Sequence, residues 1–174
     1  VGRIASMVNW VEIEDQKKNK LRFGWYDTID DLEVSKKLLE SVIEFGKKRK
    51  LEFVDGPVGF SNMDKAGLLI EGYEELNTMI TWYHYPYQKE HLKKLGFSKL
   101  AEWVEYKIKI FSAEDAPEKV KKFSKIIQQR YELKVLNFKS RKEIIHYVDK
   151  MFELLNVTYS NLQTYVTIKQ YQID

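Results

Sequence analysis

The side chains of this chain that could do chemistry gather in a short aromatic stretch near its middle. The sequence YHYPY at residues 83–87 follows Trp82 directly. Aromatic rings with a few polar groups are typical of ligand pockets, and a histidine can exchange a proton near neutral pH. The alternative is a loop whose rings cover a sheet edge and whose histidine is simply hydrogen-bonded. On the first interpretation, the candidate substrate-binding residues are Tyr83, His84, Tyr85 and Tyr87.

A second polar stretch lies in a loop that is rich in glycine. Residues 56–77 hold Gly56, Gly59, Gly67 and Gly72, which suits a chain that turns sharply or approaches another group closely. Within it, Asn62 and Asp64 could hydrogen-bond a substrate or merely form local turns. We add Asn62 to the candidate substrate-binding residues. Further groups that could exchange protons are Glu71 and Glu74.

Several kinds of site are disfavoured by what the chain contains. It has no cysteine, which removes disulfides, thiolate catalysis and cysteine-ligated zinc. Its three histidines show no metal-ligand spacing, so we predict no metal. The net charge of +3 comes from 29 basic and 26 acidic side chains, a balance that argues against nucleic acid as a partner. No apolar run has the length of a membrane span, and we expect a cytoplasmic protein.

The element that would position these residues is a strand, a turn and a helix between residues 21 and 49. Leu21, Phe23 and Trp25 alternate with other residues at the period of a strand. Asp30 with Glu33 forms the pattern of a capping box, which predicts a helix over residues 31–46. A strand that delivers its end to the start of a helix is a common site for anionic ligands.

The remaining patterns predict a mixed α/β (α+β) fold. We expect strands at 3–14, 21–26, 51–54 and 99–110, and helices at 31–46 and 88–95. The strand at 51–54 should lie parallel to that at 21–26, because a helix separates them. Residues 1–110 would form one core. Residues 111–174 would add a linker helix and then a strand, a helix and a helix, with the strand at 131–138.

This order of elements resembles the GNAT superfamily of acyl-CoA N-acyltransferases. The sequences GPVGFSNMDKAGLLIEGY at 56–73 and YHYPYQKEHLKKLGF at 83–97 are similar to those of a bacterial subgroup of tandem GNAT-like proteins. The resemblance implies a mixed central sheet flanked by helices, here lacking its first strand, followed by a partial second lobe. The chain would then be a fragment of a longer protein, whose open sheet edge would make a homo-oligomer plausible.

The resemblance also implies where acetyl-CoA or another acyl-CoA would bind. The pantetheine arm would pair with the strand edge and the pyrophosphate would meet the helix start. The superfamily's pattern Gln/Arg-x-x-Gly-x-Gly/Ala falls here on Asp30, Glu33 and Ser35, so its glycines are missing and carboxylates would face the phosphates. The helical tyrosine that often serves as general acid falls on Leu92. The implied cofactor-binding positions are Gly24, Trp25, Tyr26, Asp31 and Ser35.

Two functions therefore remain open at this stage. The first is an acyl-CoA-dependent N-acyltransferase whose amine acceptor is unknown. The second is a GNAT-like module without catalysis that binds a small molecule or another protein. The missing glycines and the missing tyrosine favour the second for this part of the chain, because function depends on the site and not on the fold.

Overall fold

The computed structural model describes residues 1–61, 63–109, 112 and 114–173. The chain divides into two compact units, of which the first joins Val1–Glu102 with Leu154–Asp174 and the second is Trp103–Glu153. The expected division at residue 110 differs from this one, because the last residues pack with the first unit.

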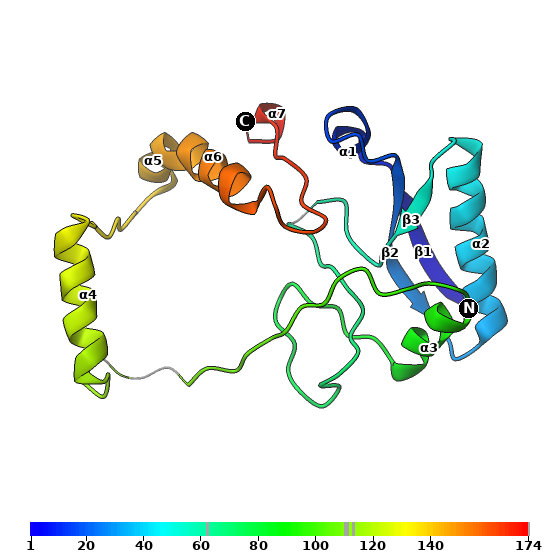
Figure 1. The fold of residues 1–174 in the computed structure, drawn as a ribbon, viewed down its shortest axis with the longest axis horizontal. Coiled ribbons are helices and arrows are strands. Elements are labelled where there is room, and N and C mark those ends of the chain that lie inside the picture. Colours follow the sequence, from blue (N-terminus) through cyan, green and yellow to red (C-terminus); the bar gives the residue numbers. More distant parts are fainter. Residues whose placement is uncertain (62, 110–111, 113, 174) are drawn as a thin grey trace. The chain divides into compact units, whose positions relative to one another are not determined.

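A small mixed sheet forms the centre of the first unit (Figure 1). It consists of β1 (Gly2–Met7), β2 (Lys20–Thr28) and β3 (Phe53–Asp55), in that order. β1 runs antiparallel to β2, while β3 runs parallel to it. The fold class is therefore mixed α/β, as the sequence predicts.

Helix α2 (Leu32–Lys48) covers one face of this sheet. Leu21 and Phe23 project from β2 and are fully buried in a core with Leu39 and Val42 of the helix. Each such side chain contributes about 1.5–3 kcal/mol when it leaves water. This packing fixes the direction in which β2 enters the turn before α2.

The other face of β2 holds charges instead of apolar side chains. Arg22 donates from Nε and Nη2 to the two carboxylate oxygens of Glu12, each at 2.7 Å. Lys20 Nζ lies 3.0 Å from Glu12 and 2.7 Å from Asp55. All four side chains are buried. Burial alone raises the pKa of Glu12, but the hydrogen bonds and charges of Arg22 and Lys20 outweigh it and hold that pKa below 4.5.

Glu12 belongs to a short helix where the sequence predicts a continuous strand over residues 3–14. β1 ends at Met7, and α1 (Trp10–Glu14) follows. The physical reason is the Asn9 side chain, which accepts from the Val11 amide at 3.1 Å and so caps the helix. The turn of α1 carries Glu12 beneath the sheet to meet Arg22.

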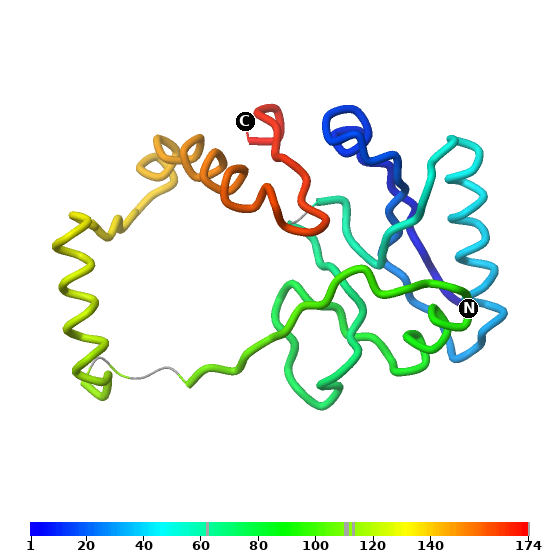
Figure 2. Tube along the Cα trace, in the orientation of Figure 1, coloured from blue at the N-terminus to red at the C-terminus, as the bar shows by residue number. Residues whose placement is uncertain are grey.

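Between β3 and the next helix lies a long connection, residues 56–85, whose described residues belong to no helix or strand of the sheet; Figure 2 shows it as a looped trace. Within it, Val58 and Ala66 form an isolated bridge. Helix α3 (Pro86–Lys94) follows, two residues ahead of the predicted start at 88. Pro86 stands at its first turn, where a missing amide costs nothing, and Gln88 Oε1 accepts from the Tyr85 amide at 2.8 Å.

The predicted strand at 99–110 is wrong over its described residues 99–109, which pair with no strand; Ile110 lies outside the described residues. The alternation is present, but an extended segment becomes a strand only beside a partner edge. Its apolar side chains are exposed, with Trp103 at 58% and Ile108 at 77%. The strand expected at 131–138 is likewise unpaired in the described part of the chain.

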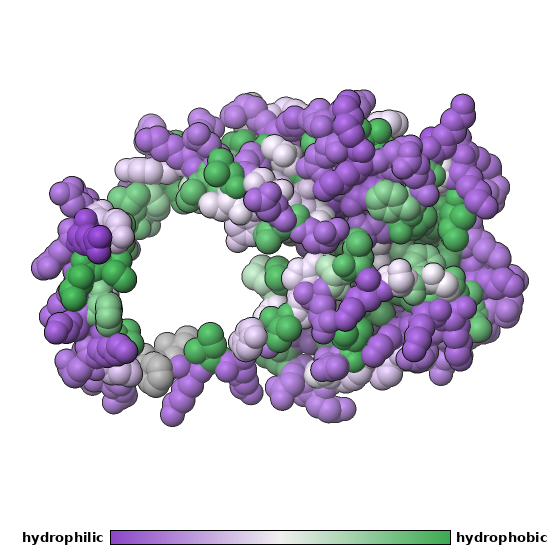
Figure 3. All heavy atoms as spheres, viewed as in Figure 1, coloured by the Kyte–Doolittle hydropathy of each residue, from purple (hydrophilic) through white to green (hydrophobic). Residues whose placement is uncertain are grey.

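The second unit contains α4 (Glu118–Arg130), α5 (Arg141–Ile144), η1 (Ile145–Tyr147) and the start of α6 (Val148–Tyr159). The apolar side of α4 stays about half exposed, and Figure 3 shows apolar side chains at the surface there. These side chains are Val120, Phe123, Ile126 and Ile127. The end of α6 and α7 (Gln170–Ile173) belong to the first unit.

We predict that Glu12→Gln lowers the free energy of unfolding by about 3–5 kcal/mol, because it leaves the buried Arg22 and Lys20 without their shared counter-charge. Urea denaturation at pH 7 measures this. The matched control is Glu44→Gln, which breaks an exposed ion pair with Lys48 and should change stability little. Equal effects of the two variants would contradict the prediction.

Candidate functional site

The two parallel strands of the sheet separate after a short contact, and a pocket opens beside the point of separation. β2 and β3 pair from Lys20 with Phe53 to Arg22 with Asp55. One further bond joins the Val58 amide to the Phe23 carbonyl at 2.8 Å. Beyond that bond the chain turns away, and a pocket of about 200 Å³ lies against β2.

A bulge in β2 forms the floor of this pocket. Arg3 pairs with Asp27 and Ala5 with Gly24, so β2 holds one more residue than β1 between these pairs. Trp25 takes up the extra length with a φ of 48°, a conformation that bulky residues rarely adopt. Such bulges are frequent next to functional sites, where they redirect a side chain. Gly24 is needed here because a Cβ would lie 2.3 Å from the Val58 carbonyl oxygen.

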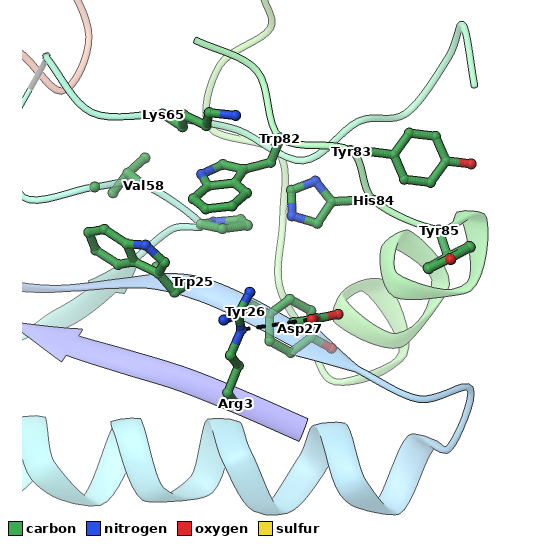
Figure 4. Close-up of a pocket in the computed structure, with 13 residues that line it drawn as sticks. Arg3, Trp25, Tyr26, Asp27, Val58, Lys65, Trp82, Tyr83, His84 and Tyr85 are labelled. Carbon is green, nitrogen blue, oxygen red and sulfur yellow. Dashed lines mark ion pairs between the residues drawn. The ribbon is translucent and has the colours of Figure 1, made fainter. Parts of the chain in front are cut away.

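The pocket brings together two groups of residues that are far apart in the sequence. Gly24, Trp25 and Tyr26 come from the strand edge, whereas Tyr83, His84 and Tyr85 come from the segment before α3 (Figure 4). The two groups are the strand-edge cofactor positions and the aromatic substrate positions suggested by the sequence. The remaining lining residues are Arg3, Asp27, Pro57, Val58, Gly59, Lys65 and Trp82.

Aromatic rings and the ammonium group of Lys65 line one part of the pocket. The rings of Trp25 and Trp82 meet edge to face, with centroids 6.4 Å apart. Lys65 Nζ lies 4.8 Å from the centroid of the Trp82 ring, within the range of a cation–π contact. Tyr83 and Tyr85 also meet edge to face at 5.5 Å. The surface offered to a ligand therefore combines aromatic rings with charged and polar groups.

His84 is a buried titratable group that lines the pocket, with an exposed fraction of 4%. Its Nδ1 accepts a hydrogen bond from the Leu69 amide at 3.3 Å, which leaves the proton of the neutral ring on Nε2. Burial lowers the pKa of His84 to about 4, although the Trp82 backbone and Asp27 act in the opposite direction. The imidazole is thus neutral at pH 7. Because its lone pair is already shared with an amide, it is better placed to donate than to act as a base.

The start of α2 is already occupied by the chain's own side chains. Asp31, and not Asp30 as the capping-box pattern predicts, caps the helix; its carboxylate accepts from the Glu33 amide at 2.9 Å and from the Val34 amide at 3.4 Å. These are the amides that would cradle a phosphate at a helix start. Asp31 does not line the pocket, so its role as a cofactor-binding residue is not supported by this geometry.

Ser35 also lies away from the pocket, because its side chain points into the core. Its hydroxyl accepts from the Tyr26 hydroxyl at 2.9 Å and contacts His91 Nδ1 at 2.8 Å. His91 Nε2 in turn lies 3.3 Å from an Asp30 oxygen. The order serine, histidine and aspartate is that of a nucleophilic site, but Ser35 is fully buried. The chain of bonds therefore joins α2 to α3 and offers a substrate no access.

The other candidates have local partners. The Tyr87 hydroxyl donates to the Thr28 carbonyl at 2.7 Å, while its ring stacks on Tyr85, so Tyr87 supports the pocket from outside its lining. Asp64 accepts from the Ser61 amide at 2.8 Å in a turn of the glycine-rich loop. Asn62 lies outside the described residues. The two further groups, Glu71 and Glu74, are exposed.

Three charged pocket residues are not singled out by the sequence, namely Arg3, Asp27 and Lys65. Arg3 Nε lies 3.8 Å from Asp27 across the β1–β2 pair, and the hairpin pattern would have placed these opposite charges near each other. No sequence signal indicates Lys65, because its position depends on how the loop returns to Trp82.

Comparison with known proteins gives one similarity to report. The chain is 28% identical over 109 residues to Protein YghO of Escherichia coli (strain K12). These residues are 60% of this chain and 28% of that protein, so the chain spans less than a third of the relative's length. No family model matches the chain. No solved structure matches it.

Among the described residues, the acidic and histidine side chains form no group of three or more that could hold a metal ion. None of the described helices combines the length and the apolar character that crossing a membrane requires.

We predict that His84 makes the protein less stable in mild acid. Because its folded pKa of about 4 lies below the ordinary 6.5, the unfolded chain binds the proton first, and the free energy of unfolding falls as the pH drops from about 6.5 to 4. The full loss from this residue is about 3 kcal/mol. Comparing urea denaturation at pH 7 and pH 5 should show about 2 kcal/mol of this loss.

His84→Asn should reduce this pH dependence, since an amide oxygen can still accept from the Leu69 amide but does not titrate. His146→Asn is the control, because His146 is exposed on η1 and should leave the profile unchanged. A profile of His84→Asn that matches the unmodified protein would show that His84 does not titrate as described.

Proposed function

We propose that this chain carries a GNAT-like lobe that binds a small, phosphate-free molecule in the opening between β2 and β3. The bulge at Trp25 and the separation of the two parallel strands support the GNAT-like resemblance, because in that superfamily the corresponding strand edge receives the ligand. The aromatic rings in the lining support a ligand with an apolar part, and Arg3, Asp27 and Lys65 offer charged partners beside them. One observation carries the proposal: the Asp31 carboxylate occupies the amides at the start of α2 that a phosphate would need.

The charges at the start of α2 also disfavour a phosphate ligand. Asp30, Asp31 and Glu33 are all exposed there, and each would oppose a pyrophosphate by roughly a kcal/mol or more in a partly screened site. The same carboxylates stabilise the helix through its dipole. The residues present therefore do not fit the pyrophosphate of an acyl-CoA, although the strand edge would accept its pantetheine arm.

The second candidate is an acyl-CoA-dependent N-acyltransferase. The bulge favours it, because the backbone around Gly24–Tyr26 lies free of β3 and lines the pocket. Against it stand the helix start and His84, whose lone pair is engaged by the Leu69 amide.

Location and assembly remain predictions of the sequence. We infer a cytoplasmic protein, since the chain has no cysteine. We also infer self-association through the outer edge of β1, which among the described residues pairs only with β2. Size-exclusion chromatography with light scattering tests the second inference, and a monomer at all concentrations would contradict it.

We expect millimolar acetyl-CoA to leave the melting temperature unchanged. A true ligand at about a hundred times its dissociation constant would stabilise the protein by roughly 2.7 kcal/mol, which differential scanning fluorimetry resolves. S-acetyl-pantetheine, which lacks the pyrophosphate and the nucleotide, is the matched probe. A clear shift with acetyl-CoA would favour the acyltransferase over our proposal.

The variant Asp31→Asn/Glu33→Gln separates two reasons why acetyl-CoA would not bind. One is repulsion by the carboxylates, and the other is that Asp31 already occupies the amides at the helix start. Asparagine caps a helix about as well as aspartate, so the helix keeps its start while two negative charges disappear. If only repulsion excludes acetyl-CoA, this variant should gain a shift that the unmodified protein lacks. No gain would mean that the occupied amides, and not the charges, are decisive.

A further inference from the structure

Arg22 contacts the pocket wall and the end of the chain at the same time. Its Nη1 donates to the Gly59 carbonyl at 3.1 Å, and Gly59 lines the pocket. Its Nη2 donates to the Thr164 carbonyl at 2.7 Å. Glu12 holds the same guanidinium with two bonds of 2.7 Å. Because the guanidinium is a planar, rigid fork, these partners cannot shift independently of one another.

The C-terminal segment, residues 164–169, belongs to the first unit and packs against the part of that unit formed by residues 1–102. Tyr165 and Val166 are about 95% buried. The Tyr165 carbonyl accepts from Gln16 Nε2 at 3.1 Å, and Lys169 forms an ion pair with Asp15. From helix α6, the Asn156 side chain bonds both backbone groups of Ile168, at 3.0 and 2.9 Å. Docking of this segment shields the buried Arg22 side chain from water.

Within the described part of the chain, the pocket wall, residues 57–59, is otherwise held by backbone bonds alone. The Val58 amide donates to the Phe23 carbonyl at 2.8 Å, the Gly59 amide to the Lys65 carbonyl at 3.0 Å, and the Pro57 carbonyl accepts from the Gly67 amide at 2.8 Å. Just beyond the wall, Asn9 Nδ2 donates to the Phe60 carbonyl at 3.0 Å. If the C-terminal segment left, water would reach the guanidinium and compete for the Gly59 carbonyl, and the wall would lose its buried, charge-assisted bond.

We propose that Arg22 is a positioning residue through which the docked C-terminal segment fixes the wall of the pocket. Release of residues 164–169 would loosen Pro57–Gly59 and weaken any ligand held there; that effect on a ligand rests on the proposed function, whereas the effect on the wall does not. The segment thus acts as a regulatory element for a pocket that it does not line.

The test releases the segment without touching Arg22 or the pocket. Gln16→Ala/Lys169→Ala removes two of its anchors, and hydrogen exchange of the full-length, ligand-free protein is followed by NMR. We expect the amides of Val58 and Gly59 to exchange about tenfold faster together with that of Ile168, as for units that open jointly. The amides of Leu39 and Val42 in α2 should keep their rates. The matched control, Glu44→Ala/Lys48→Ala, removes an exposed ion pair on α2 and should change none of the three wall and segment amides.

Faster exchange at Ile168 with unchanged rates at Val58 and Gly59 would overturn the proposal. Equal acceleration of the α2 amides would also overturn it, because the protein would then merely be less stable. A second variant, Arg22→Lys, cannot bridge both carbonyls with a rigid fork; where it folds, adding Gln16→Ala/Lys169→Ala should no longer affect Gly59. Because every readout is taken without ligand, failure of the proposed function would leave this test intact.

Discussion

The first unit depends on one buried ion pair, that between Arg22 and Glu12. Arg22 stands on a strand whose other face is apolar, so its guanidinium must be neutralised beneath the sheet. Glu12 does this with both oxygens, Lys20 and Asp55 balance the remaining charge, and the carbonyls of Gly59 and Thr164 take two further donors. Helix α1, the loop after β3 and the C-terminal segment all meet at this group. A buried charge thus fixes where three separate segments lie.

The pocket follows from a second constraint on the same strand. β2 is held on one side by β1 and on the other by β3, but β3 is short and leaves the later part of β2 without a parallel neighbour. The extra residue at Trp25 is accommodated there, at the cost of an unusual backbone conformation. Rings from the segment before α3 cover the exposed edge. The two interpretations of the aromatic stretch, as pocket lining and as edge cover, therefore describe one arrangement.

Local patterns in the sequence are sufficient to predict part of this structure. The alternation of Leu21 and Phe23 and the amphipathic helix after them specify β2, α2 and the apolar core between them. The predicted strand at 99–110 is wrong over its described residues, because alternation indicates an extended chain while only a partner edge makes it a strand. The residues around Glu12 have the sequence pattern of a strand, and only the cap formed by Asn9 makes them a helix. The meeting of Trp25 with Trp82 depends on the bulge, which alternation does not reveal.

The start of α2 shows why the ligand that a fold suggests can differ from the ligand that its site can bind. Every helix leaves its first amides without partners inside the helix, and a protein can satisfy them with a ligand's phosphate or with its own carboxylate. Here Asp31 supplies the carboxylate, and the neighbouring acids add to the stability of the helix while repelling an anion. The same amides cannot serve both partners at once. Asp31 therefore satisfies these amides from within the chain, and the pocket beside the bulge is lined by other groups, among them the strand edge and aromatic rings.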